Sequence, residues 1–211
     1  MKRLFLLIGL LAGLCHNAHA DNPRVVIETE LGDIVIEVMV DKAPVSGGDF
    51  LTYVKKGLYD GEGFYRVVRS ADNDNGTPKI DVIQGGILAE GMGLNPVAHE
   101  TTEATGIKHT DGTVSLARGD VGTGSAAYIF ITVGDQPSLD FGGTRNPDKQ
   151  GFAAFGRVID GMDVVRKIHN LTPDLFELGD GYMAGQLLKE PVRINKTTRT
   201  SVEFGETREQ H

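Results

Sequence analysis

Side chains that usually carry acid–base, nucleophilic or metal chemistry are few and scattered in this sequence. After residue 20 the histidines are His99, His109, His169 and His211. None stands in HExxH or another metal-ligating spacing, and we expect structural or surface roles for them. No GxSxG nucleophile motif is present. The glycines at 119, 122 and 124 lack the Lys-Ser/Thr pair of a phosphate loop. We therefore expect neither a metal nor a cofactor.

The composition indicates one acidic, cysteine-poor domain. The chain has 211 residues, of which 40% are apolar and 24% charged, with a net charge of −8 and a single cysteine. This length suits one domain with its own core. A single cysteine excludes a disulfide framework within the chain, a four-cysteine zinc site and a CxxC redox centre. Because the basic residues form no cluster, the negative charge argues against nucleic-acid binding.

The first twenty residues have the pattern of a secretory signal peptide. Lys2 and Arg3 precede an apolar run over residues 4–14, and Ala18 and Ala20 occupy the −3 and −1 positions of a cleavage site. The run is too short to span a membrane. Cleavage after Ala20 removes the cysteine and two positive charges, which changes the net charge from −8 to −10. We favour a Gram-negative periplasmic location, with a secreted or eukaryotic luminal product as the alternative, and expect a monomer that does not bind a membrane after cleavage.

The rest of the chain predicts many short strands and two helices. Alternation from Val25 to Met39 predicts a β-hairpin. One helix is expected to begin at Ala43-Pro44 and end at Gly57, and a second to cover Gly161–His169 with Asp160 as its N-cap. Further β-rich runs are residues 64–68, 80–84, 113–117, 128–133 and 192–194. This pattern favours one helix-capped closed barrel over residues 21–200, followed by a polar tail over residues 201–211.

A series of short segments in a fixed order indicates the function. They are Leu58–Gly61, Phe64–Val67, Val82–Gly86, Gly112–Arg118, Tyr128–Thr132, Leu139–Asp140, Phe152–Val158 and Asp160–Met162. Each is weak alone, but in this order they closely resemble the cyclophilin family of peptidyl-prolyl cis-trans isomerases over about residues 24–195. The resemblance implies a mostly β fold, a closed eight-stranded antiparallel barrel capped by two helices. The strand number comes from the resemblance alone.

Prolyl isomerisation fits the scarcity of catalytic side chains. Rotation about an X-Pro bond crosses a barrier of about 18–20 kcal/mol because resonance gives the bond double-bond character. The twisted state localises the lone pair on the prolyl nitrogen, so a fixed cationic donor stabilises it more than the planar state. No nucleophile or metal is needed. The resemblance assigns the cationic role to Arg66 and gives Gln84 the task of orienting it.

The resemblance also implies a set of substrate-binding positions. Val82, Phe130, Leu139 and Phe152 would form the proline pocket, and Ala117 with Arg118 would hold the residue before proline. The whole expected substrate-binding set is Phe64, Val82, Ala117, Arg118, Tyr128, Phe130, Leu139 and Phe152. The implied partners are proline-containing polypeptides.

Several positions depart from the family pattern. Ten extra residues around Ser70 to Lys79 separate Arg66 from Gln84. Asp81 then falls where a pocket phenylalanine is usual, Tyr128 replaces a glutamine, and Ser138 replaces a larger aromatic residue. We expect an altered proline pocket and weak cyclosporin binding. The insert could be a lid or a calcium-attracting loop, but it lacks the spacing of an EF-hand, and we expect a solvated loop.

Two other function classes remain open. The departures at Asp81 and Tyr128 allow a cyclophilin-like module or chaperone that binds proline segments with little turnover. A hollow ligand-binding barrel of lipocalin type would need an empty interior, whereas the dense small and aliphatic residues on the strands favour a filled one.

Overall fold

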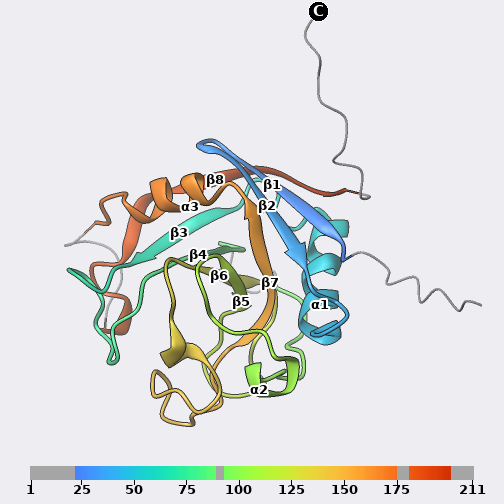
Figure 1. Ribbon diagram of the computed structural model, residues 1–211. Coiled ribbons are helices and arrows are strands. Elements are labelled where there is room, and N and C mark those ends of the chain that lie inside the picture. The colour runs from blue at the N-terminus through green and yellow to red at the C-terminus, as the bar shows by residue number, and fades with distance from the viewer. Residues whose placement is uncertain (1–21, 89–92, 175–180, 201–211) are drawn as a thin grey trace, which may run out of the picture.

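Eight strands in the described part of the chain form a closed antiparallel barrel (Figure 1). The computed structural model describes residues 22–88, 93–174 and 181–200, so the predicted leader and tail lie outside the described residues. Around the barrel the strand order is β1-β2-β7-β5-β6-β4-β3-β8. The bounds are β1 (Arg24–Thr29), β2 (Gly32–Val38), β3 (Gly63–Val68), β4 (Val82–Gly86), β5 (Thr113–Leu116), β6 (Tyr128–Thr132), β7 (Ala153–Asp160) and β8 (Leu187–Thr200). The expected fold class is confirmed.

The segments that connect the strands contain the helices. They are α1 (Pro44–Lys55), α2 (Thr102–Thr105), α3 (Met162–His169) and the short 3₁₀ turns η1 (Pro137–Leu139) and η2 (Gly181–Met183). The two main helices, α1 and α3, agree with the prediction, whereas the single turn of α2 was not predicted. α1 and α3 lie at different ends of the barrel in Figure 1. Among the described residues, no helix has the length and apolar character needed to cross a membrane.

The predicted hairpin forms as β1 and β2. Ile27 pairs with Ile34 across the ladder, and both side chains are fully buried inside the barrel. The turn between the strands uses Gly32 at φ +129°, a conformation that only glycine adopts readily. Alternate inward residues thus begin the core, as the period-two pattern indicated.

The sequence predicted only a short part of β8 and did not predict β7 as a strand. β8 runs over fourteen residues and closes the barrel by pairing with both β1 and β3, although only residues 192–194 were expected. Its outward positions are polar and Pro191 interrupts the pattern, so the apolar signal is short. β7 is rich in small residues, which carry little strand propensity. Gly156 is needed there because a Cβ would lie 2.8 Å from the Glu37 carbonyl oxygen.

The barrel interior is filled by aliphatic and aromatic side chains. Phe50 of α1 packs against Phe155 of β7 and Tyr59, with ring centroids 5.1 and 5.7 Å apart. All three side chains are almost completely buried. This packing anchors α1 on the barrel, and a filled interior leaves no room for the ligand cavity of a lipocalin.

The helix boundaries follow from local contacts. Pro44 begins α1, and Gly57 follows its end at φ +64°. The Gly47-Gly48 pair does not interrupt its first turn, because the Glu100 carboxylate accepts hydrogen bonds from Val45 N and Ser46 N at 3.1 and 2.7 Å. Glu100 therefore has a structural role at the start of α1.

The start of α3 corrects one prediction. Gly161 is the N-cap, in the left-handed region at φ +88°, and Asp160 lies one residue earlier, where its carboxylate accepts a bond from Gly161 N. The chain approaches β2 so closely here that a Cβ on Gly161 would stand 2.2 Å from the Asp33 carbonyl oxygen. Val165 and Ile168 are buried beneath the helix.

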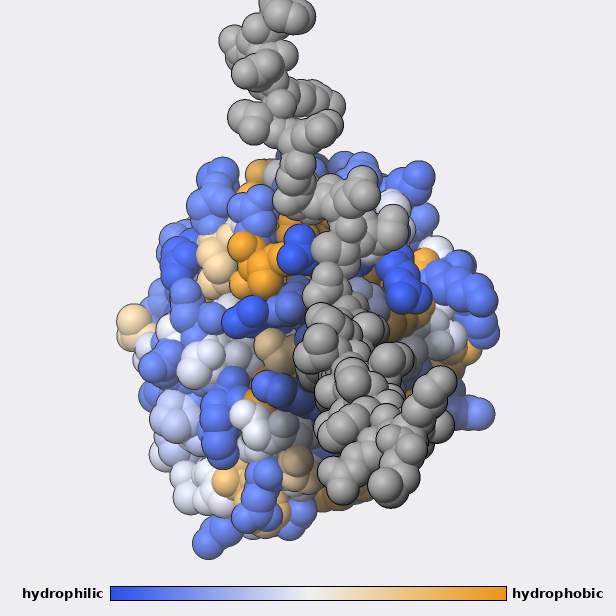
Figure 2. All heavy atoms as spheres, turned by 45° about the vertical axis from the view of Figure 1, so that its right-hand side comes forward, coloured by the Kyte–Doolittle hydropathy of each residue, from blue (hydrophilic) through white to orange (hydrophobic). Residues whose placement is uncertain are grey.

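The outer surface is largely polar. On the face shown in Figure 2, apolar atoms occur in small patches separated by hydrophilic side chains. This distribution is what an antiparallel barrel with an apolar interior and a solvated exterior requires.

Replacing Gly161 tests the close approach of α3 to β2. We expect Gly161→Ala to lower the free energy of unfolding by about 3 kcal/mol, because it adds a backbone clash to left-handed strain. Gly106→Ala is the matched control, since Gly106 has φ +72° but nothing within 4 Å of a Cβ, and it should cost only about 1 kcal/mol. Urea denaturation measures both. Equal losses would contradict the clash.

Candidate active site

The strand register aligns the expected catalytic residues in one row across four strands. Arg66 of β3 pairs with Gln84 of β4, Gln84 with Phe130 of β6, and Phe130 with Ser115 of β5. Neighbours in such a row share one face of the sheet and lie within side-chain contact. The row brings together residues far apart in sequence on the outer face of the barrel.

A local irregularity in β3 determines which neighbours join that row. The pairing of β3 with β4 and β8 shifts register between Phe64 and Arg66. As a result both Tyr65 and Arg66 line the same cavity, whereas a regular strand would place adjacent residues on opposite faces. Phe64 is fully buried in the barrel core and does not line the cavity. Its expected contact with substrate is therefore wrong.

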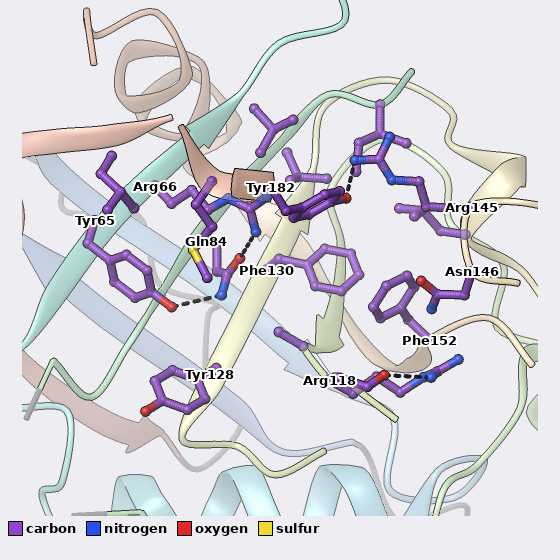
Figure 3. Close-up of a pocket in the computed structure, with 18 of the residues that line it drawn as sticks. Tyr65, Arg66, Gln84, Arg118, Tyr128, Phe130, Arg145, Asn146, Phe152 and Tyr182 are labelled. Atoms are coloured by element: carbon purple, nitrogen blue, oxygen red, sulfur yellow. Dashed lines mark hydrogen bonds between the residues drawn. The ribbon is translucent and has the colours of Figure 1, made fainter. Parts of the chain in front are cut away.

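A cavity of about 740 Å³ opens beside the row. Its apolar wall is a cluster separate from the barrel core, formed by Val68, Ile80, Val82, Phe130 and Leu139 with Ala117 and Phe152 packed against them. Phe130 and Phe152 meet edge to face, with centroids 5.2 Å apart (Figure 3). A cavity of this kind can hold a small apolar ring against a rigid aromatic surface.

Arg66 is one of three arginines that line the cavity, with Arg118 and Arg145. It is only 8% exposed, and Nη1 donates to Gln84 Oε1 at 2.7 Å. Nε and Nη2 both donate to Gln186 Oε1, at 2.9 and 2.6 Å. Burial lowers the pKa of Arg66, although Tyr182 and Tyr65 oppose the shift, and an arginine remains charged in a protein. Three of its five N–H groups thus bond the two glutamines, and a hydrogen bond with the Tyr182 side chain also favours the charged form of Arg66.

Gln186 is the residue that sequence reasoning missed. It is fully buried, and its Nε2 donates to the carbonyl oxygen of Asn73 at 2.8 Å. Gln186 lies 120 positions from Arg66 along the chain, next to a strand that was only partly predicted. No motif in the sequence therefore pointed to its contact with Arg66. The opposite support, Gln84, donates from Nε2 to the hydroxyl oxygen of Tyr65 at 2.7 Å, and burial raises the pKa of Tyr65 to about 12.

The expected rim residues also line the cavity. The Arg118 guanidinium lies 5.3 Å from the Phe152 ring centroid and donates two hydrogen bonds to Asp148, at 2.8 and 2.9 Å. Ala117 and Tyr128 stand beside it, joined by a bond from Ala117 N to Tyr128 O at 2.8 Å. Every expected substrate-binding residue except Phe64 thus borders the cavity.

Asp81 does not enter the cavity despite its place in the sequence. Its carboxylate accepts a bond from Ser70 N at 3.0 Å and lies 3.5 Å from His169 Nε2. Its neighbours Ile80 and Val82 supply the apolar wall. The pocket therefore remains apolar at this point.

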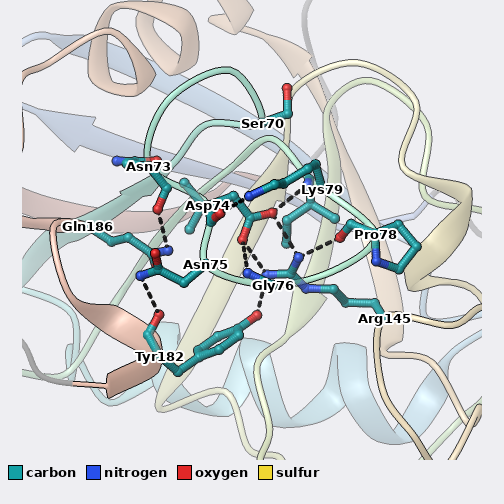
Figure 4. Close-up of polar contacts among 12 residues, drawn as sticks. Ser70, Asn73, Asp74, Asn75, Gly76, Pro78, Lys79, Arg145, Tyr182 and Gln186 are labelled. Atoms are coloured by element: carbon teal, nitrogen blue, oxygen red, sulfur yellow. Dashed lines mark hydrogen bonds and ion pairs between the residues drawn. The ribbon is translucent and has the colours of Figure 1, made fainter.

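The insert is largely exposed, as expected of a solvated loop, but two buried side chains anchor it to the site, which the sequence did not predict. Asn73 and Asp74 are buried, and Asp74 forms a two-bond ion pair with Arg145 at 2.7 and 2.8 Å (Figure 4). Asp74 also accepts from Gly76 N and Ile80 N, at 2.9 and 2.7 Å. Burial opposes ionisation of Asp74, but these hydrogen bonds and Arg145 outweigh it and lower the pKa of its carboxyl group.

A buried Asp-His-Ser chain lies behind the pocket. His109 Nδ1 is 2.8 Å from Asp140 Oδ1, and Nε2 is 2.8 Å from Ser115 Oγ. The geometry is that of a hydrolase triad, but Ser115 is fully buried, so no substrate reaches its hydroxyl. The chain instead supports the pocket, because the His109 ring stacks on Phe130 at 5.9 Å. Within the described ranges, no cluster of three or more potential metal ligands occurs.

The fold and site are those of a known class. A closed eight-stranded barrel with a guanidinium beside an apolar pocket on its outer face is the arrangement the sequence resemblance implied. The family model described as cyclophilin type peptidyl-prolyl cis-trans isomerase/CLD matches residues 24–199. The chain belongs to the cyclophilin family.

Individual relatives agree with this assignment. The chain is 33% identical to a peptidyl-prolyl cis-trans isomerase of Acinetobacter baylyi, over 92% of this chain and 93% of that protein. It is 35% identical to peptidyl-prolyl cis-trans isomerase B of Escherichia coli, over 82% and 98%. A cyclophilin-type isomerase of Cryptosporidium parvum, crystallised in the presence of the dipeptide Ala-Pro, superposes with a TM-score of 0.64 at 20% identity, covering 85% of this chain and 99% of that chain. The protein is a peptidyl-prolyl cis-trans isomerase, and its substrates are proline-containing polypeptides.

Acidification tests the buried ion pair of the insert. The folded pKa of Asp74 lies below the unfolded value of 3.8, so its contribution to stability is complete above about pH 4 and is lost as the pH falls further. Asp74→Asn should cost about 3–5 kcal/mol at pH 7, because it leaves Arg145 buried without its partner. It should also flatten the dependence of the unfolding free energy on pH below about pH 4, where the wild type loses this contribution.

Asp163→Asn is the matched control for this measurement. Asp163 pairs with Lys167 on the exposed face of α3, and exposed pairs of this kind contribute little. Urea denaturation at several pH values should show almost no change. If Asp74→Asn behaves in the same way, the insert does not depend on its ion pair.

Proposed function

We propose that this protein accelerates rotation of X-Pro bonds in exported polypeptides, with Arg66 donating to the prolyl nitrogen. The observation that carries the proposal is the Arg66 guanidinium, which lines an apolar pocket and is held by two neutral amides. A proline ring seated against Phe130 would bring its nitrogen within reach of that guanidinium. The donor then bonds better to the twisted, pyramidal nitrogen than to the planar amide, which lowers the barrier.

The supports of Arg66 suit this task. Gln84 and Gln186 are neutral, and among the described residues no carboxylate pairs with Arg66. A carboxylate would compete with the substrate for the charge, whereas neutral amides fix the geometry and leave the cation available. The Ala117–Arg118 rim would hold the residue before proline. The weak cyclosporin binding expected from Ser138 stays a prediction.

The proposed role of Arg66 is tested by substitution. Arg66→Ala should lower kcat/KM for a prolyl tetrapeptide by about 10²–10³, the usual cost of removing a donor aimed at transition-state charge. Arg66→Lys keeps the charge but not the planar fork that bonds both glutamines, and should recover only part of the rate. Gln186→Leu should lower it by about tenfold through loss of orientation. The measurement is cis-trans exchange followed by NMR.

Arg157→Ala is the control arginine substitution. Arg157 is exposed on β7 and pairs with Glu37, away from the cavity, so the rate should not change. If Arg66→Ala is as active as the wild type, the mechanism is wrong. If the wild type gives no exchange above the uncatalysed rate, the protein acts as a binding module for proline segments.

We also propose that the chain is exported to the periplasm, where the mature protein is a monomer. The support is the charged, apolar and small-residue pattern of residues 1–20, followed by the domain over residues 21–200 and the polar tail. The mature chain would carry no cysteine, so an oxidising compartment would not affect it. On the visible face of Figure 2 no broad apolar patch suggests a subunit interface.

Expression of the full chain in a Gram-negative host tests export. Osmotic shock should release a protein whose mass corresponds to a chain beginning at Asp21, and an Ala20→Asp variant should remain unprocessed. A chain begun at Asp21 after an initiator methionine is the control and should stay in the cytoplasm. Full-length, uncleaved protein in the cytoplasmic fraction would contradict the proposal, and size-exclusion chromatography of the mature form tests the monomer.

A further inference from the structure

Exposed apolar side chains gather at the mouth of the cavity. Large apolar residues that are more than a third exposed are few in the described part of the chain, and four of them line the cavity, namely Leu88, Tyr128, Tyr182 and Met183. Tyr182 is the most exposed of these, at 51%. Exposed apolar groups concentrated at a pocket entrance indicate contacts with a ligand that extends beyond the pocket.

Tyr182 is held firmly although it is exposed. Its ring lies between two guanidinium groups, 5.2 Å from Arg66 and 5.4 Å from Arg145, and its hydroxyl accepts a hydrogen bond from Arg145. Asn75 Nδ2 donates to the carbonyl oxygens of Tyr182 and Ala184, at 3.2 and 2.8 Å. A ring fixed in this way loses little conformational entropy when it binds another side chain.

The insert supplies the support for this ring. Arg145 is 8% exposed, and its charge is balanced by the two-bond pair with Asp74, while Nη1 also donates to Pro78 O at 2.5 Å (Figure 4). The 70–80 loop thus fixes Arg145, and Arg145 fixes Tyr182. Through Arg145, the ten extra residues thus hold the aromatic ring of Tyr182 beside Arg66.

The position of Tyr182 relates it to one side of the substrate. In Figure 3, Tyr182 and Arg118 lie on opposite sides of Phe130. If a proline sits on Phe130 and the residue before it lies at Arg118, the chain leaves the pocket past Tyr182. The residue that follows proline then faces the tyrosine ring.

We propose that Tyr182 is a specificity-determining residue that binds the side chain following proline and selects an aromatic or large aliphatic group there. This inference rests on the proposed placement of the substrate beside Arg66. Ring-to-ring and ring-to-aliphatic contacts with a fixed aromatic residue favour such side chains over alanine by about three- to tenfold. A lysine is disfavoured, because Arg66 stands 5.2 Å from the ring without a carboxylate partner among the described residues.

A peptide series with one variable residue tests the inference. Cis-trans exchange is measured by NMR on acetyl-Ala-Ala-Pro-Y-amide peptides in which Y is Phe, Leu, Ala, Lys or Glu. For the wild type we expect kcat/KM for Phe and Leu to exceed that for Ala by about three- to tenfold, with Lys lowest. Tyr182→Ala should bring the Phe-to-Ala ratio close to one, whereas Tyr182→Phe, which keeps the ring, should retain it.

The pattern of failure separates this inference from the proposed mechanism. If Tyr182→Ala lowers all five rates by one factor, or changes none of them, Tyr182 does not determine specificity. A wild-type preference for Glu over Phe would also overturn the inference, since it would assign selection to the guanidinium groups. Failure of the mechanism has a different signature, because Arg66→Ala would then keep full activity on every peptide. Thermal unfolding of each variant confirms that it folds.

Discussion

A guanidinium group buried beside an apolar surface is unstable unless its N–H groups are bonded, and this constraint organises the whole site. Arg66 meets it with two amide oxygens, from Gln84 and Gln186, which satisfy donors without neutralising the charge. Each amide is itself fixed, Gln84 by Tyr65 and Gln186 by the backbone of Asn73. The cation is therefore oriented from both sides without being neutralised.

The barrel provides what the arginine needs, which is a rigid row of neighbours. Arg66, Gln84 and Phe130 lie opposite one another because three strands are in register, and the apolar wall comes from the same outer face. The filled interior stiffens that face from behind, and the His109 ring between Asp140 and Ser115 stiffens it beneath Phe130. Burial opposes ionisation of Asp140, but the hydrogen bonds from His109 outweigh it and lower the pKa of the Asp140 carboxyl group. At an exposed surface the Asp140–His109–Ser115 network would have the arrangement of a catalytic triad. Here it is buried and supports the ring of Phe130.

Sequence reasoning identified what is local or ordered along the chain. The β1–β2 hairpin and the Pro44 helix start are confirmed because alternation and capping are visible in one dimension. Motif order singled out Arg66, Gln84 and Phe130, and the strand register places these three in one row. Phe64 was misassigned because a register shift, which no propensity encodes, turns Tyr65 and Arg66 to the cavity and leaves Phe64 in the core. Gln186 and Arg145 were missed because their partners are 120 and 71 positions away.

Two departures from the family pattern, Asp81 and the insert, have effects in the structure that the sequence did not indicate. Asp81 stands in the sequence where an apolar side chain was expected, yet it turns to Ser70 and His169, and Ile80 provides the apolar wall. The insert that shifts this alignment also carries Asp74, whose pair with Arg145 would be costly to bury if either partner were alone. Bonded in full, the pair instead fixes the position of Tyr182 next to Arg66. The extra residues between Arg66 and Gln84 thus hold an aromatic side chain at one side of the cavity, while the pairing of Arg66 with Gln84 is kept.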